Sequence, residues 1–388
     1  MVESNSEESL EIHDNLENGV KEPTLQESIN AIIQTNYYFN AIIVIFFPLG
    51  MLAHLFHWSD GLTFMLNFIA IVGLAKMLDL CTDELSKRLG QTIGALVNAS
   101  FGNAVELIVG ILALKEGLVV VVQSSILGSQ LSNMLFVLGF CFFLGGLKFK
   151  TQKFNLEAAN VNCSILMLGM IGFLLPAAFS IQETDKERLL VHELSFSRGT
   201  SVCLLIIYIG FMVFQLHTHK AMFCSSDDTE EEEHVRHLSF PVIIVSFVIT
   251  TVLIALSAES LVGSIEGLSK SWGLSEAFIG LILIPIVGNA AEHVSAISAA
   301  MRNKMDLAIG VALGSTLQVS IFVTPLLVII AWIMNVPLTL SFPVFDVAVV
   351  FVTTIVVVHL CNDGQSNWLE GFMLLMSYVV VAFAYLVL

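Results

Sequence analysis

Charged residues are scarce in this chain of 388 residues. Asp, Glu, Lys and Arg together make up only 13%, whereas hydrophobic residues make up 56%. A soluble protein of this length cannot keep that much apolar surface away from water. The mean hydropathy of +0.85 therefore predicts a polytopic membrane protein.

Other absences narrow the function. The chain has no basic stripe, which argues against nucleic acid as a partner. Its six cysteines show no CxxC or zinc-ligand spacing, so we interpret them as reduced core residues. No HExxH or GxSxG motif is present, and the chain is therefore not expected to be an enzyme.

The net charge of −17 comes largely from two acidic segments. Residues 1–36 are predicted to form an acidic, disordered cytosolic tail. Residues 217–238 are predicted to be an acidic cytosolic linker, which lacks the spacing of an EF-hand. Its acidic run is either a solvated loop or a low-affinity, regulatory collector of Ca²⁺, and both interpretations stay open at this stage. The run consists of Asp227, Asp228, Glu230, Glu231, Glu232 and Glu233.

Hydropathy predicts an all-α membrane protein with eleven transmembrane helices, because each crossing needs about 20 apolar residues. If the N-terminus is cytosolic, ten of the 16 Lys and Arg residues fall on the cytosolic side and five on the other side, as the positive-inside rule requires. The predicted spans are 37–56, 61–81, 90–114, 118–146, 156–179, 199–216, 239–260, 275–301, 306–334, 341–360 and 368–388.

An internal repeat organises these spans. The motif GNAVE at 102–106 recurs 186 residues later as GNAAE at 288–292, and LGS at 127–129 recurs as LGS at 313–315 with the same offset. Five predicted spans separate the copies, so the second copy is inverted. The expected architecture is a first repeat of five helices (61–216), a second repeat of five (239–388) and one extra helix (37–56). In such folds the substrate binds near the bilayer midplane, where the repeats meet.

The repeated motif predicts a cation site. Glu106 and Glu292 lie inside apolar spans, where a carboxylate costs several kcal/mol unless it is paired, hydrated or protonated. Asn103 and Asn289 precede them by three residues and therefore share a helix face with them. Gly102 and Gly288 stand where a helix can loosen and expose carbonyl groups.

Such an all-oxygen site favours Ca²⁺ over Mg²⁺, zinc or copper. When the metal leaves, burial favours protonation of the same carboxylates, and this exchange of metal for protons is the logic of an antiporter. The alternative is that these Asn and Glu residues only hold helices together.

Several further residues have two interpretations each. Ser129, Ser315, Ser132 and Gln318 either reach the ion or a proton path, or serve helix packing. Asp83, Glu84 and Glu259 lie near helix ends and are either acids that attract cations to the site or ordinary solvated charges. His293 follows Glu292 and is either a proton relay or a packed side chain.

The repeats GNAVELIVGILALKEG and GNAAEHVSAISAAMRNKMDLAIGVALGS resemble the signature repeats of the Ca²⁺/H⁺ exchanger (CAX) family, most closely its fungal vacuolar branch. This resemblance implies eleven spans, a vacuolar or other acidic-organelle membrane, and Ca²⁺ uptake driven by protons leaving the lumen. It implies that Glu106 and Glu292, with Asn103, Asn289 and nearby carbonyls, bind the ion.

Exchange of Na⁺ or another cation on the same fold is the alternative, and a Ca²⁺ channel is less favoured. The sequence leaves open whether Mn²⁺ is carried, the proton stoichiometry and the oligomeric state. Membrane lipid is the one partner besides the transported ions that it implies.

Overall fold

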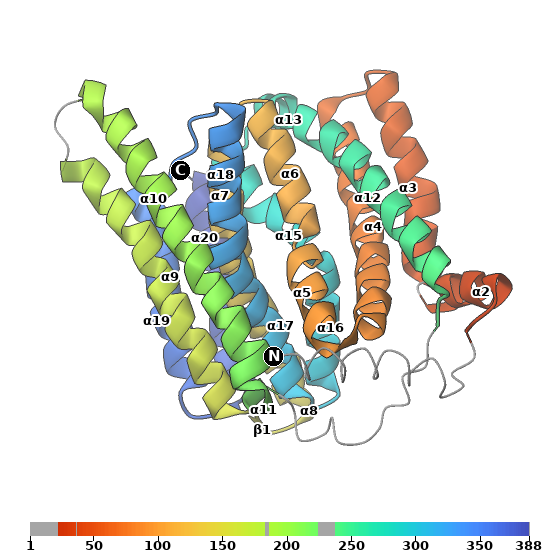
Figure 1. The fold of residues 1–388 in the computed structure, drawn as a ribbon. Coiled ribbons are helices and arrows are strands. Elements are labelled where there is room, and N and C mark those ends of the chain that lie inside the picture. The colour runs from red at the N-terminus through yellow and green to blue at the C-terminus, as the bar shows by residue number, and fades with distance from the viewer. Residues whose placement is uncertain (1–21, 36, 183–185, 224–236, 388) are drawn as a thin grey trace, which may run out of the picture.

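The computed structural model describes residues 22–35, 37–182, 186–223 and 237–387, which form a bundle of long helices (Figure 1). Within these ranges nine helices are long and apolar enough to cross a bilayer, and a tenth span results if the bent pair Ile265–Trp272 and Glu276–Gly288 counts as one. The all-α, polytopic architecture is confirmed. The predicted number of eleven spans stays a prediction, partly because the predicted span 90–114 is two short helices.

The described elements of the first half, in chain order, are α2 (Leu25–Thr35), α3 (Tyr37–Leu55), α4 (Asp60–Arg88), α5 (Gly90–Phe101), α6 (Ala104–Lys115), α7 (Val119–Leu131), the π-helical segment η1 (Ser132–Val137), α8 (Leu138–Lys148), β1 (Gln152–Lys153), α9 (Leu156–Gln182), α10 (Lys186–Val213), the π-helical segment η2 (Phe214–Thr218) and α11 (Lys220–Phe223).

Those of the second half are α12 (Phe240–Gly263), α13 (Ile265–Trp272), α14 (Glu276–Phe278), the π-helical segment η4 (Ile279–Leu283), α15 (Ile284–Gly288), α16 (Ala290–Met301), α17 (Met305–Gln318), the π-helical segment η5 (Val319–Val323), α18 (Thr324–Met334), α19 (Val344–Cys361), β2 (Gln365–Ser366) and α20 (Trp368–Val387). Strands β1 and β2 pair antiparallel.

The two repeats run in opposite directions. In Figure 1, α5 and α6 lead from the lower end of the bundle to the upper end, whereas α15 and α16 lead from the interior to the lower end. Both pairs are interrupted at the repeated motif, α5 and α6 by Gly102 and Asn103, and α15 and α16 by Asn289. The breaks therefore meet inside the bundle from opposite sides, as an inverted repeat requires.

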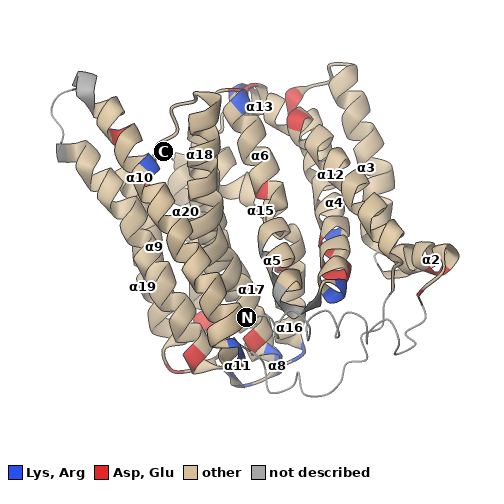
Figure 2. Cartoon of the chain, in the orientation of Figure 1, with Lys and Arg blue, Asp and Glu red and all other residues tan. Residues whose placement is uncertain are grey.

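Most charged residues lie toward the two ends of the bundle, as the colouring of Figure 2 shows. The flanks between them are apolar and expose large side chains, including Val44, Ile206, Val248 and Val352. This is the distribution expected of a lipid-facing surface. Helix α6 differs, because it carries an acidic residue in its first turn, in the interior of the bundle (Figure 2).

Helix α2 corrects one sequence-based expectation. Residues 1–36 were expected to be disordered, yet Leu25–Thr35 form a helix. Its first turn is closed by a reciprocal capping box, in which the Thr24 N–H donates to Glu27 (2.7 Å) and the Glu27 N–H donates to the Thr24 hydroxyl (3.3 Å). Ala31 and Ile32 then pack against a small apolar cluster formed by Leu85, Leu238 and Ile243. The expectation of disorder rested on the acidic composition of this segment and did not take the capping residues and the apolar face into account.

Candidate cation site

The site is built on two matching helix breaks. Asn103 has φ −97° and ψ 25°, and Asn289 has φ −94° and ψ 11°, so the repeat positions share one backbone conformation. Each Asn carbonyl accepts the N–H of the residue four positions later, at 3.1 Å from Leu107 and 2.9 Å from His293. Glu106 and Glu292 consequently stand in the first turns of α6 and α16. There the aligned peptide dipoles favour a negative charge.

The side chain of each glutamate lies next to the motif of the other repeat. A Cβ atom added to Gly288 would lie 3.2 Å from the Cδ atom of Glu106, and one added to Gly102 would lie 3.8 Å from Oε1 of Glu292. Each carboxylate therefore lies against the glycine of the other repeat's motif. The predicted partners Gly102, Glu106, Gly288 and Glu292 do come together. At Gly288 a larger residue would push into the space that Glu106 occupies.

Both carboxylate oxygens of Glu106 and Oε2 of Glu292 are buried. Neither oxygen of Glu106 has a hydrogen-bond partner in the described part of the chain, and Oε2 of Glu292 has none either. Ser315 lies within hydrogen-bond reach of Glu292. An unpaired carboxylate in the membrane interior costs several kcal/mol. This pair of side chains therefore requires cations or protons.

Amide side chains form hydrogen bonds that link each helix break to the opposite repeat. Nδ2 of Asn103 donates to Oε1 of Gln318 on α17 (2.6 Å), and Nδ2 of Asn289 donates to the hydroxyl of Ser129 on α7 (2.8 Å). With its nitrogen engaged in this way, Asn289 keeps a buried Oδ1 that has no donor among the described residues. The predicted residues Ser129, Ser315 and Gln318 thus lie in the same hydrogen-bonded cluster as the two helix breaks.

Sequence comparison of the repeats missed two amides in the same region. Gln130 and Asn133 are both buried, and Nδ2 of Asn133 donates to the Ser315 hydroxyl at 2.9 Å. Both atoms of the Gln130 amide lack a partner in the described structure. Their repeat positions are Thr316 and Val319, so self-similarity gave no signal. An amide inside an apolar span is itself a signal that would have identified them.

The acids predicted near helix ends lie outside this cluster. Glu84 is buried and accepts the backbone N–H groups of His237 (3.1 Å) and Leu238 (3.4 Å). Asp83 is exposed and pairs with Lys87 at 2.9 Å. Glu259 is exposed and pairs with Lys115 at 3.3 Å. The structure thus gives Glu84 an anchoring contact and places the other two in surface ion pairs, which contribute little stability.

His293 and Ser132 are buried beside the site. The His293 ring packs against Phe136, with 5.7 Å between ring centroids, and its Nε2 atom has no partner among the described residues. The acidic run from Asp227 to Glu233 lies outside the described residues. Within the described ranges, no three His, Cys, Asp or Glu side chains group as a metal cluster. Any cation at the site therefore depends on two carboxylates supplemented by neutral oxygens.

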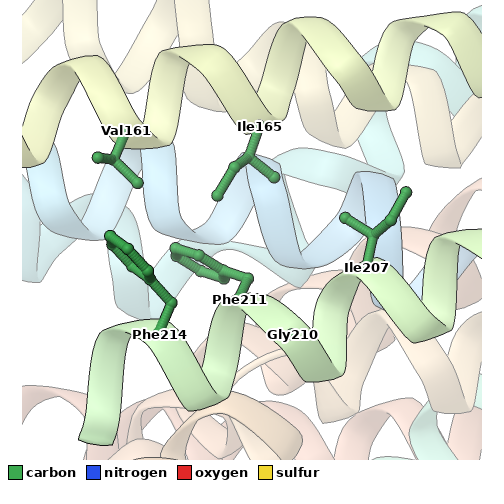
Figure 3. Close-up of a pocket in the computed structure, with 6 residues that line it drawn as sticks. All are labelled: Val161, Ile165, Ile207, Gly210, Phe211 and Phe214. Atoms are coloured by element: carbon green, nitrogen blue, oxygen red, sulfur yellow. The ribbon is translucent and has the colours of Figure 1, made fainter. Parts of the chain in front are cut away.

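Two hollows of the surface lie away from this cluster. One lies between α9 and α10 and is lined by the apolar residues shown in Figure 3, namely Val161, Ile165, Ile207, Gly210, Phe211 and Phe214. It offers no carboxylate, amide or hydroxyl group to a cation. This hollow lies on the apolar flank of the bundle and is not an ion site.

The two halves of the site differ in packing. A Cβ atom added to Gly128 on α7 would lie 2.1 Å from the carbonyl oxygen of Leu281, so α7 and η4 are in close contact. In an α-helix this carbonyl would accept the N–H of residue 285, but that residue is Pro, which has no N–H, and the segment Ile279–Leu283 is π-helical. The repeat position of Gly128 is Gly314 on α17, where an added Cβ atom would meet nothing within 4 Å, and the same holds for Gly310. Gly102 is exposed whereas Gly288 is buried.

This pair of glutamates in an inverted repeat is accompanied by sequence similarity over most of the chain. The family model described as sodium/calcium exchanger protein matches residues 60–217 and 242–387. The chain belongs to this family. The vacuolar calcium ion transporter of Schizosaccharomyces pombe is 44% identical over 351 residues, covering 90% of this chain and 84% of that protein.

Two further relatives agree. The Ca²⁺/H⁺ antiporter of Synechocystis is 39% identical over 362 residues, covering 89% of this chain and 96% of that protein. The structure of native YfkE superimposes with a TM-score of 0.77 at 34% identity, covering 90% of this chain and 100% of that one. The resemblance inferred from the repeats is confirmed.

Proposed function

We propose that this chain is a secondary active antiporter that moves Ca²⁺ out of the cytosol in exchange for H⁺. One observation carries the proposal: two carboxylates, one from each inverted repeat, lie at matching helix breaks against the other repeat's glycine, and three of their four oxygens are buried without a hydrogen-bond partner in the described structure. The relatives named above, a vacuolar calcium transporter and a Ca²⁺/H⁺ antiporter, support the same function.

The mechanism uses the same oxygens for two cargoes. In one state Glu106 and Glu292 give carboxylate oxygens to Ca²⁺, and neutral oxygens complete the six to eight ligands that Ca²⁺ takes. These are supplied by the side chains of Asn103, Asn289, Ser129 and Ser315 and by the carbonyls of Gly102 and Gly288. In the other state each carboxylate carries a proton, which removes the cost of its buried charge. Because one cargo displaces the other, metal movement is coupled to proton movement.

The difference between the two halves supports alternating access. The contact of Gly128 with η4 closes one side of the site, whereas the α17 face with Gly310 and Gly314 is uncovered and Gly102 is exposed. The uncovered side is the lower end of the bundle in Figure 1, where α4 ends and α11 lies. The Lys and Arg distribution assigns this end to the cytosol. The conformation described here is therefore the one that loads Ca²⁺ from the cytosol.

An acidic organelle supplies sufficient driving force. A lumen two pH units more acidic than the cytosol provides about 2.7 kcal/mol per proton, and a tenfold Ca²⁺ gradient costs about 1.4 kcal/mol. Two protons, one for each glutamate, then support a gradient of roughly 10⁴ before any membrane potential is counted. A vacuolar membrane, with the N-terminus and the acidic linker in the cytosol, fits this driving force and the name of the vacuolar relative.

The experiment is Ca²⁺ uptake by the purified chain in sealed liposomes. An acidic lumen should drive uptake, a Na⁺ gradient should not, and Ca²⁺ entry should be matched by proton release. Glu106→Gln at equal protein level is the control for leak. Uptake driven by Na⁺ instead would identify a Na⁺/Ca²⁺ exchanger. Uptake that follows only the Ca²⁺ gradient, with no proton movement, would identify a channel and overturn the proposal.

A further inference from the structure

Helix α2 presents three different faces. Ser28, Ala31 and Ile32 face the rest of the protein: Ser28 is fully buried, and Ala31 and Ile32 pack beside Leu85, Leu238 and Ile243. A polar face consists of Gln26, Asn30 and Gln34, all of which are exposed. Leu25, Ile29 and Ile33 form the third face, at 64%, 46% and 51% exposure. Their spacing of four residues places them in one stripe along the helix.

The orientation of α2 is set by contacts at both ends. The Ser239 N–H donates to the Ser28 hydroxyl at 2.9 Å, and Nδ2 of Asn40 donates to the Ile32 carbonyl at 2.8 Å. Arg88 donates to Glu22 at 2.7 Å, just before the helix, and also to the carbonyl of Leu238. The helix therefore cannot turn its apolar stripe inward without breaking these contacts.

The stripe is continuous with the surface that faces the bilayer. Residue 36 alone separates α2 from the membrane-crossing helix α3, and α2 lies across the lower end of α3 (Figure 1). Tyr37 and Tyr38 begin α3 and are 66% and 81% exposed. Exposed tyrosines at the end of a span mark the level of the membrane interface. Further along α3, Val44 and Ile45 are exposed to the hydrocarbon.

We propose that α2 is an interfacial helix, with Leu25, Ile29 and Ile33 immersed in the headgroup and acyl boundary of the cytosolic leaflet. The three faces fit this position: one contacts the protein at the side, one the lipid and one the water. Because Leu25–Thr35 contains no Lys or Arg, binding rests on apolar burial and needs no anionic lipid. The occupant of the exposed stripe is thus a neutral bilayer surface.

The test places a nitroxide on single cysteines in the full-length chain, with the six natural cysteines replaced and Ca²⁺ uptake verified. The protein is reconstituted in phosphatidylcholine liposomes. Leu25→Cys, Ile29→Cys and Ile33→Cys are compared with the matched exposed controls Gln26→Cys, Asn30→Cys and Gln34→Cys. Collision rates with O₂, which partitions into lipid, and with a water-soluble nickel chelate are measured for each position.

We expect the ratio of O₂ to nickel collisions to be several-fold higher at the stripe than at the controls, and unchanged when phosphatidylserine is added. Equal ratios on both faces would show that Leu25, Ile29 and Ile33 are in contact with water, and would overturn the proposal. Low collision rates with both reagents would show that a second protein surface covers the stripe, which also overturns it. A difference seen only with phosphatidylserine would contradict the neutral-surface assignment.

A second measurement avoids replacing the cysteines. In the otherwise natural chain, Ile29→Trp and Asn30→Trp add one tryptophan to the same background of four. Brominated phosphatidylcholine should quench the added emission of Ile29→Trp several-fold more strongly than that of Asn30→Trp. Equal quenching at the two positions would place α2 outside the lipid.

Discussion

Two glycines at matching repeat positions should have opposite effects when each is changed to alanine. In Gly128→Ala the new Cβ atom would lie 2.1 Å from the Leu281 carbonyl oxygen, whereas in Gly314→Ala it would meet nothing within 4 Å. Helices α7 and η4 must separate by roughly 1 Å before the first contact reaches ordinary van der Waals distance. Backbone atoms on both sides make this a costly adjustment.

The magnitude follows from the cost of overpacking. Inserting one methyl group into a tightly packed contact typically costs about 1–3 kcal/mol. Gly128→Ala should therefore shift the equilibrium away from the described conformation by roughly 5- to 150-fold. Gly314→Ala leaves this conformation unstrained. In the proposed opposite conformation the inverted repeat would bring α17 against α5, so the same change should raise the energy of that state. Its shift should have the opposite sign.

The assay uses Gly310→Cys, which lies one turn before Gly314 on the uncovered face of α17. The natural cysteines are replaced, and labelling by a membrane-impermeant maleimide is timed in oriented vesicles. Gly128→Ala should slow the labelling and Gly314→Ala should leave it as fast or faster, at equal amounts of folded protein. Slowing by both variants, or acceleration by Gly128→Ala, would refute the assignment of the closed and open sides.

Three further predictions concern the site and the linker. Glu106→Gln and Glu292→Gln should each insert normally and abolish pH-driven Ca²⁺ uptake. Each change removes half of the negative charge that faces the divalent ion and one of the two carboxylates that carry protons. Near-normal uptake by either variant would contradict the symmetric site. Gln318→Ala should raise the Ca²⁺ concentration that gives half-maximal uptake roughly 5-fold, because the lost hydrogen bond to Asn103 contributes about 1 kcal/mol. An unchanged concentration would show that Gln318 is not part of the site. Neutralising the six acids within 227–233 should leave uptake working but change its Ca²⁺ dependence, and complete loss in correctly inserted protein would indicate a structural role instead.

The sequence alone determined the class of the molecule and predicted the pair of carboxylates at the centre of the candidate site. Long apolar runs demand membrane helices, because backbone groups in lipid must be hydrogen-bonded within the chain. The repeated GNAVE and GNAAE motifs identified Glu106 and Glu292, since a carboxylate in an apolar span is costly unless it functions. These inferences use local composition and an exact spacing, which a linear sequence displays in full.

The tertiary structure decided what depends on partners distant in the chain. It showed that Glu84 anchors the backbone at His237, that Asn133 joins Ser315, and that Leu25–Thr35 fold against other helices. It also distinguished Gly128 from Gly314, which share the same LGS motif. Under the proposed alternating-access mechanism, these identical residues differ because the described conformation is one of two inverted arrangements, and the sequence by itself does not show which contacts are made in either.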